Sequence, residues 1–186
     1  TSRLCQRSIA AWSRQSPMHF TPVPEEHRGL VPAEPELLSA FAAHGSHIAI
    51  CVYKIANAQC LYLYEQTEAA FQCLQAIAPR LSFIAGSISV VEHQFYLSLC
   101  AATLCRAESE PRRGELLAIL SRGVQRFTTW AATCPDNFLH KQQLLDALHA
   151  ELTGDLWRAM QLFEQAIANA AQHEFNHMEA LACECL

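Results

Sequence analysis

Apolar residues recur at steps of three and four along most of the chain beyond residue 36. This spacing places apolar side chains on one face of an α-helix. No segment alternates apolar and polar residues with period two between turn signals, so the predicted class is all-α. The clearest stripes are Ile88, Val91, Phe95, Leu99 and Ala102; Leu116, Leu120, Val124, Phe127 and Ala131; and Leu156, Ala159, Phe163, Ala166 and Ala170. A further row is Ile48, Val52, Ile55 and Gln59, with Ile50, Lys54 and Ala58 off it.

Turn signals divide this region into successive helices. Gly154 suits the left-handed residue that follows a helix, and Asp155 suits the N-cap of the next one. In the run CPDN, Pro135 ends one helix and Asp136 is predicted to cap the next. The predicted helices cover residues 36–44, 46–64, 67–77, 88–107, 114–133, 138–152 and 155–172.

The chain repeats itself weakly. The segment GDLWRAMQLFEQAI (154–167) aligns with EQTEAAFQCLQAIA (65–78), and the two are 89 residues apart. One further helix pair lies between them, which gives about 44 residues per pair, within the range of helical solenoids. A lone pair cannot bury its own apolar face, so pairs must stack. The predicted hairpins join 46–64 to 67–78, 88–107 to 114–133, and 138–152 to 155–172.

Composition and charge exclude several classes of function. Hydrophobic residues make up 51% and charged residues 17% of the chain, its net charge is −5, and its most basic run is Arg112-Arg113. A nucleic-acid-binding protein would carry a basic stripe, so no nucleic-acid partner is predicted. Nine cysteines without a CxxC pair indicate a reducing, cytoplasmic compartment in which most thiols are small buried side chains. Glu92, His93 and Gln94 interrupt the most apolar stretch, 81–104, so no membrane span is predicted.

Two regions are expected along the chain. Five of the eight prolines fall between Pro17 and Pro35, which predicts an extended connector after one short helix that contains Trp12. The predicted domains are therefore residues 1–35, the short helix and proline-rich connector, and residues 36–186, the helical-repeat domain. Because the chain begins with Thr and ends in ALACECL, we expect it to be a fragment of a longer chain.

Two resemblances extend this interpretation. The segment 154–170 resembles the second half of a tetratricopeptide repeat, although Gln143, Asp146 and Ala147 depart from its first half. More widely, residues 46–186 resemble the helical-repeat module of very large bacterial, cyanobacterial-type multi-sensor signalling kinases. The runs that carry this likeness are HQFYLSL (93–99), WAATCPDNFLHKQQLLDA (130–147), LTGDLWRAMQLFEQAIANA (152–170) and EALA (179–182), whereas Glu65 stands where that family usually has Gly.

These resemblances imply a fold and a function. The fold would be a right-handed, tetratricopeptide-like α-solenoid of stacked antiparallel hairpins. The function would be that of a non-catalytic interaction and linker module in a multidomain signal-transduction kinase. It would couple an ATPase and Ser/Thr-kinase half to a sensor and histidine-kinase half, with proteins as partners and no cofactor of its own. Any ATP site of the parent protein would lie elsewhere, since this chain has no glycine-rich phosphate loop.

The run HEFNH (173–177) matches the zinc-protease pattern H-E-x-x-H. That chemistry needs both histidines on one helical turn, a glutamate free to act on bound water, and a third ligand. The stripe from Phe163 to Ala170 instead ends its helix near residues 172–174, so His173 and His177 should fall on opposite sides of a turn. The prediction is a turn and not a metal site.

Other candidate residues have simpler structural interpretations. His140 and Lys141, just inside a helix start, could bind an anion there, but the preferred interpretation is a histidine hydrogen-bonded to a neighbouring hairpin and a solvated lysine. The pair Cys183 and Cys185 is interpreted as buried thiols. The remaining candidates are interpreted as a helix cap and a surface histidine (Ser87, Ser89, His93) and as solvated carboxylates (Glu25, Glu26, Glu108, Glu110).

The sequence therefore predicts no catalytic, cofactor-binding or metal-binding residue in this segment. Two alternatives remain open beside the linker module. One is a zinc-dependent hydrolase that uses HEFNH, and the other is a small-molecule sensor on the concave face of the solenoid.

Overall fold

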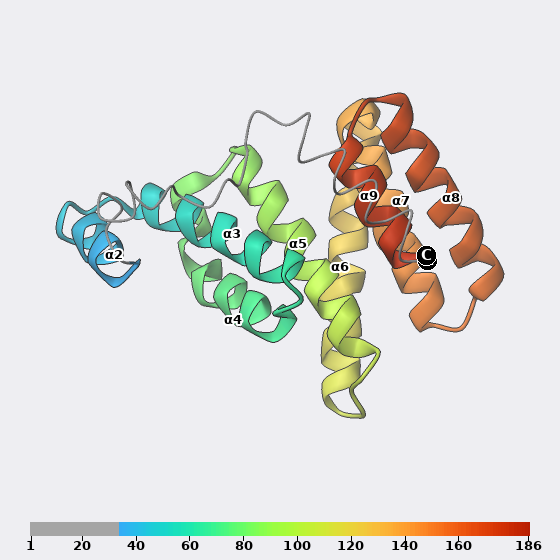
Figure 1. Ribbon diagram of the computed structural model, residues 1–186, viewed down its shortest axis with the longest axis horizontal. Helices are drawn as coiled ribbons and strands as arrows, with labels where there is room; N and C mark the ends of the chain where they lie inside the picture. Colours follow the sequence, from blue (N-terminus) through green and yellow to red (C-terminus); the bar gives the residue numbers. More distant parts are fainter. Residues whose placement is uncertain (1–33) are drawn as a thin grey trace, which may run out of the picture. The chain divides into compact units, whose positions relative to one another are not determined.

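The computed structural model describes residues 34–186, and this part of the chain contains helices but no strand (Figure 1). The predicted all-α class is confirmed. The connector predicted for residues 1–35 lies outside the described residues, except that Glu34 and Pro35 already belong to the first described helix. The elements are α2 (Glu34–Ala43), α3 (His47–Leu63), α4 (Thr67–Ile77), the 3₁₀ helix η2 (Ala78–Ile84), α5 (Ile88–Cys105), α6 (Arg112–Thr133), α7 (Pro135–Leu152), α8 (Leu156–Gln172) and α9 (Asn176–Cys185).

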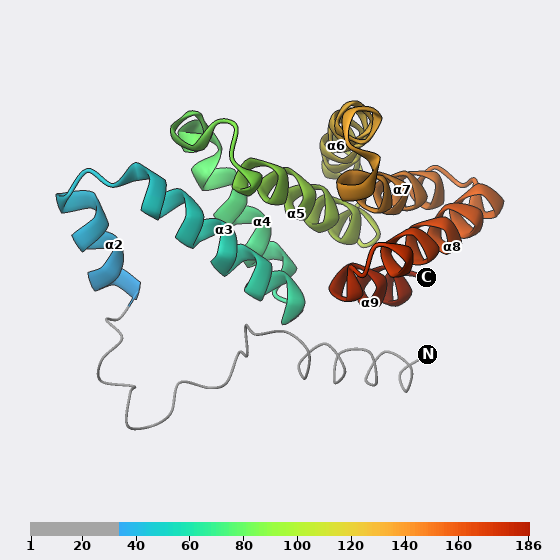
Figure 2. The same ribbon diagram turned by 90° about the horizontal axis from the view of Figure 1, so that it is seen from above.

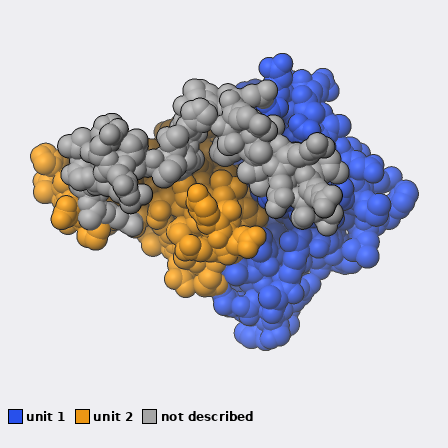
Figure 3. Space-filling view, in the orientation of Figure 1, with its two compact units in different colours: residues 1–17, 101–186 blue, residues 18–100 orange. Residues whose placement is uncertain are grey.

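The described residues form two compact units (Figure 3). The N-terminal unit, orange in the figure, contains residues 34–100 and so includes α2, α3, α4, η2 and most of α5. The C-terminal unit, blue, contains residues 101–186 and so includes the end of α5 and helices α6 to α9. The boundary falls inside α5, so the predicted pairing of 88–107 with 114–133 crosses it and stays a prediction.

In the N-terminal unit α3 and α4 form an antiparallel hairpin, as predicted for 46–64 and 67–78 (Figure 1). Pro79 has no backbone N–H to continue α4, and the chain tightens there into η2, which packs against both helices. A small buried core joins the three elements: Cys51, Ile55, Ile77 and Ile84, with Leu81 and Val90 packed against it.

The predicted core row of α3 is wrong in part. Ile48 is 59% and Val52 45% exposed, whereas Ile50 and Ala58, which the pattern placed off the row, are buried. Because α3 is apolar on nearly all sides, its sequence pattern does not select one face. The contacts with α4 and η2 select it instead.

In the C-terminal unit helices α6 to α9 pack in chain order, and α7 also reaches α9 (Figure 2). The predicted hairpin of 138–152 with 155–172 is confirmed. The stripes of α6 and α8 face the core as predicted, except that Val124 is partly buried and Leu156 is exposed. Arg113 of α6 links the ends of α5 and α7, because its guanidinium donates to the carbonyls of Cys105 (2.8 Å) and Leu152 (2.9 Å).

Helix α5 is the one described helix whose length and composition would allow it to cross a membrane, with a mean hydropathy of 1.2 over 18 residues. However, 61% of this helix is buried inside the protein. One of its polar residues is held in place, since His93 Nε2 donates to the carbonyl of Leu74 at 2.9 Å. Burial of this kind is typical of a core helix.

The same turn joins successive helices at four places. Each turn has one residue with positive φ: Gly45 (63°), Glu65 (62°), Gly154 (91°) and Glu174 (61°). In the α7–α8 turn Gly154 N–H bonds to Glu151 O (3.0 Å) and Asp155 N–H bonds to Ala150 O (2.9 Å). This pair of bonds defines a Schellman motif, and the other three turns repeat it.

The left-handed residues agree with the predicted 89-residue repeat, but one predicted N-cap is wrong. Glu65 and Gly154 are separated by the 89-residue offset, and Asp155 caps α8 by accepting from Arg158 N–H at 3.2 Å. Asp136, in contrast, is not an N-cap. Helix α7 already begins at Pro135, the residue before Asp136, and its N-cap is Cys134.

Replacing Glu65 by Gly should stabilise the protein. A left-handed conformation costs a side-chain-bearing residue about 1–2 kcal/mol, which exceeds the added chain entropy of Gly, so we expect a gain of about 0.5–1 kcal/mol. Urea unfolding followed by circular dichroism measures the change. The matched control is Glu164→Gly in the middle of α8, which should lose about 1 kcal/mol. A loss of stability in both variants would contradict the prediction.

Candidate functional site

The HEFNH segment forms the turn between α8 and α9. His173 is the C-cap of α8, Glu174 is the left-handed residue, and Phe175 is the N-cap of α9, in which His177 lies. The predicted turn is confirmed. Within residues 34–186 no group of three or more His, Cys, Asp or Glu side chains lies close enough to hold a metal ion.

His140 packs against this turn. Its ring stacks on Phe175 with centroids 4.4 Å apart and is only 1% exposed. Neither ring nitrogen makes a hydrogen bond, so the predicted bond to a neighbouring hairpin is wrong. Burial, and to a lesser extent the positive charges of Lys141, His177 and His173, lowers the pKa of His140 to about 3. The ring is therefore neutral near pH 7 and offers no charge to an anion.

Lys141 also differs from its prediction. Its side chain is buried and not a solvated charge. The reason is its position on α7, which packs against α6, α8 and α9 and so has few faces open to water. A helix with several buried faces hides some polar residues as well as apolar ones.

Three further interpretations change with the structure. His93, predicted at the surface, is buried and donates to Leu74 O, and the Ser87 hydroxyl makes no hydrogen bond, so it does not cap α5. Cys183, predicted to be buried, is exposed on α9, whereas Cys51, Cys100 and Cys105 are buried as expected. The carboxylate of Glu108 pairs with Arg112 at 2.9 Å instead of being solvated alone.

Two features that the sequence did not indicate are open to solvent. The first is an apolar patch at the start of α8, formed by Leu156, Trp157 and Met160, which are between 51% and 70% exposed. At the repeat-equivalent position of Met160, Phe71 on α4 is 5% exposed. In the N-terminal unit η2 packs against α4, and His93 of α5 donates to the carbonyl of Leu74 on α4.

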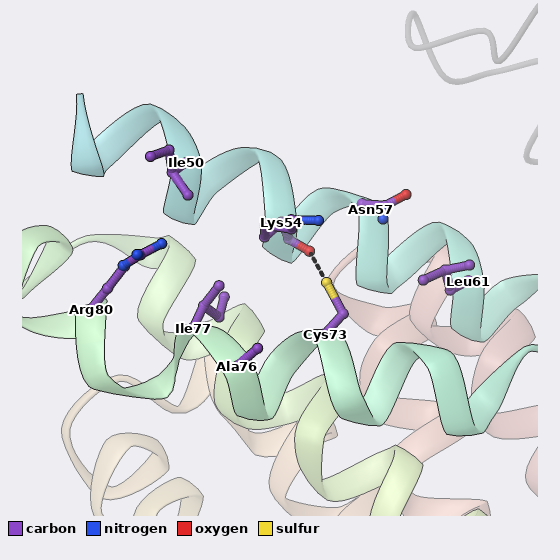
Figure 4. Close-up of a pocket in the computed structure, with 8 residues that line it drawn as sticks. All are labelled: Ile50, Lys54, Asn57, Leu61, Cys73, Ala76, Ile77 and Arg80. Atoms are coloured by element: carbon purple, nitrogen blue, oxygen red, sulfur yellow. Dashed lines mark hydrogen bonds between the residues drawn. The ribbon is translucent and has the colours of Figure 1, made fainter. Parts of the chain in front are cut away.

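The second feature is a pocket of about 310 Å³ in the α3–α4 hairpin (Figure 4). Arg80 extends from η2 toward α3, and Cys73 Sγ donates to the carbonyl of Lys54 at 3.5 Å. The lining residues are Ile50, Lys54, Asn57 and Leu61 from α3, Cys73, Ala76 and Ile77 from α4, and Arg80 from η2. The pocket is mostly apolar, contains two cationic side chains and has no acidic residue in its lining.

The comparisons with known proteins agree with the helical-repeat fold. A family model described as CHK1-like, TPR repeats matches residues 51–185. That range contains helices α4 to α9 and most of α3. No curated protein and no solved structure was found to match the chain.

We expect the purified protein to hold no stoichiometric zinc and to have no hydrolase activity. The HEFNH histidines lie on either side of a left-handed residue, and therefore not on one turn of a helix as zinc proteases require. Elemental analysis tests this. One tightly held zinc per chain that is lost in His173→Ala would overturn the expectation.

Acid should destabilise the protein partly through His140. The folded-state pKa lies below the unfolded value of about 6.5, so its contribution is complete above pH 6.5 and is lost as pH falls toward 3. The loss is at most about 1.4 kcal/mol for each pH unit. In His140→Leu the free energy of unfolding, measured in urea between pH 7.5 and 5, should fall less steeply with pH. Phe175→Leu, which removes the stacked ring but keeps the histidine, should keep the steep dependence; equal slopes in the His140→Leu variant and the unaltered protein would refute this assignment.

Proposed function

The chain belongs to the family of CHK1-like TPR repeats, and we propose that it works as a non-catalytic protein-interaction and linker module of a signal-transduction kinase. The observation that carries the proposal is the match of the repeat family over residues 51–185, together with helices that pack in succession. Tetratricopeptide-type repeats serve as interaction modules because their stacked helices build extended surfaces.

The apolar patch of Leu156, Trp157 and Met160 supports a protein partner. Exposed apolar side chains that gather in one place mark interaction sites, and Trp is among the residues that contribute most to binding energy. Met adds an adaptable thioether that fits varied apolar surfaces. The patch is on α8 within the C-terminal unit, and its three residues are within five positions of one helix.

The finer proposal concerns the parent protein. The likeness of residues 46–186 to the repeat module of multi-sensor kinases supports a place between an ATPase and Ser/Thr-kinase half and a sensor and histidine-kinase half. In that place the module, in the cytoplasm, would hold its neighbours at a set spacing. A stack of hairpins passes strain along, since each repeat contacts only its neighbours.

The packing of α8 on its neighbours provides a way to test coupling. Ala159 is 3% exposed, and its repeat equivalent Ala70 is fully buried, so both positions accommodate only a small side chain between packed helices. Ala159→Phe should overpack this contact and cost about 1–3 kcal/mol.

In the longer polypeptide that carries this segment, we expect Ala159→Phe to reduce the dependence of kinase output on its input, while the distant domains stay folded. The measurement is autophosphorylation with and without the stimulus, beside thermal unfolding of the repeat. Gln172→Ala, an exposed change on the same helix, is the control and should leave coupling unchanged. Intact coupling in an Ala159→Phe protein whose repeat is measurably loosened would defeat the linker proposal and leave a separate binding role.

A further inference from the structure

We propose that the pocket in the α3–α4 hairpin binds a small amphiphilic anion, namely an apolar body that carries one carboxylate. The pocket lies within the N-terminal unit and shares no residue with the apolar patch on α8. Its volume of about 310 Å³ is at the lower end of the range for small-molecule sites, about 300–1,000 Å³, and so suits a ligand smaller than a folded peptide.

The apolar part of the ligand follows from the lining. Ile50 and Ile77 belong to the buried side of the hairpin, and Leu61 and Ala76 extend the same apolar surface. Each methylene group of a ligand that enters such a surface gains about 0.8 kcal/mol. A purely polar anion would forgo that gain.

The carboxylate of the proposed ligand is inferred from the cationic side chains in the lining. The charged residues among those that line the pocket are Arg80 and Lys54, and both are cationic. A guanidinium presents paired N–H donors that match the two oxygens of a carboxylate, and an ammonium adds a second positive charge. Asn57 adds a neutral amide to the lining. A guanidinium beside an apolar lining is the chemistry that holds an amphiphilic acid.

The second copy of the repeat has different residues at the positions that correspond to this lining. The 89-residue offset aligns α3 and α4 with α7 and α8 and places Gln143 at the position of Lys54 and Gln165 at that of Ala76. In the α7–α8 hairpin Gln143 Nε2 donates to Gln165 Oε1 at 3.5 Å, so the two side chains link the helices.

In the α3–α4 hairpin the same site stays open because Ala76 is too short to cross it (Figure 4). By the same offset Arg80 of η2 aligns with Asn169 of α8, so neither cation has a charged counterpart in the second copy. The two cations of the lining therefore belong to the α3–α4 copy of the repeat.

The direct test is binding of decanoate below its micelle-forming concentration, measured by isothermal titration calorimetry on the whole chain. Decanol and acetate are the paired probes, because one lacks the charge and the other lacks the apolar tail. We expect decanoate to bind at least about tenfold more tightly than either. No decanoate binding, or decanol binding as tight as that of decanoate, would overturn the proposal.

Variants locate the site. Arg80→Gln should weaken decanoate binding about tenfold, as expected for loss of a charge-assisted hydrogen bond. Ala76→Gln should abolish binding, because it places a long side chain in the lining of the pocket. Arg158→Gln, which removes an exposed arginine from α8, is the matched control and should bind as the unaltered protein does. Unchanged binding in Ala76→Gln would place decanoate elsewhere and end the proposal.

A chemical readout checks the position independently. Cys73 lines the pocket and is partly exposed, whereas Cys183 is exposed on α9. Decanoate should slow the alkylation of Cys73 by iodoacetamide several-fold, followed by peptide mass spectrometry, and leave Cys183 unchanged. Equal rates at Cys73 with and without decanoate would contradict the site. Because none of these measurements depends on α8 or on kinase coupling, their failure would leave the proposed linker function standing.

Discussion

A single left-handed residue at four of the helix junctions is the constraint on which the hairpins of this fold depend. Once a helix ends in a Schellman motif, its last carbonyls are satisfied and the chain reverses within three residues, so the next helix must lie against the one before it. Gly154 adopts the conformation without steric cost, whereas Glu65 and Glu174 adopt it with a side chain. The packing of the two helices on each side must offset that cost.

The same constraint explains why a zinc-protease pattern occurs without the corresponding geometry. The turn after α8 needs a helix C-cap, a left-handed residue and a new N-cap in succession, and these roles fall on His173, Glu174 and Phe175. Phe175 then packs its ring on His140 of α7. The residues of HEFNH thus join helices, and the histidine that the turn buries is neutral because it has lost its water.

Repetition of one hairpin frame leaves room for different surfaces. In α7 and α8 a glutamine pair links the two helices, whereas the corresponding residues of α3 and α4, Lys54 and Ala76, line a pocket. At the start of α8 the opposite occurs, since Met160 is exposed where Phe71 is buried. The two copies therefore share the positions that pack each hairpin and differ at positions around it.

The sequence by itself determined the helical class, the 89-residue repeat, the α6 stripe and most of the α8 stripe, and the Gly154–Asp155 turn, because these depend on local periodicity and backbone preference. It misplaced the core face of α3, the burial of His93 and Lys141, and the exposure of Cys183. An evenly apolar helix has no preferred face, and a polar residue is buried only when a second helix covers it. The pocket and the patch on α8 depend on which neighbouring helix covers each side chain, and only the tertiary structure decides that.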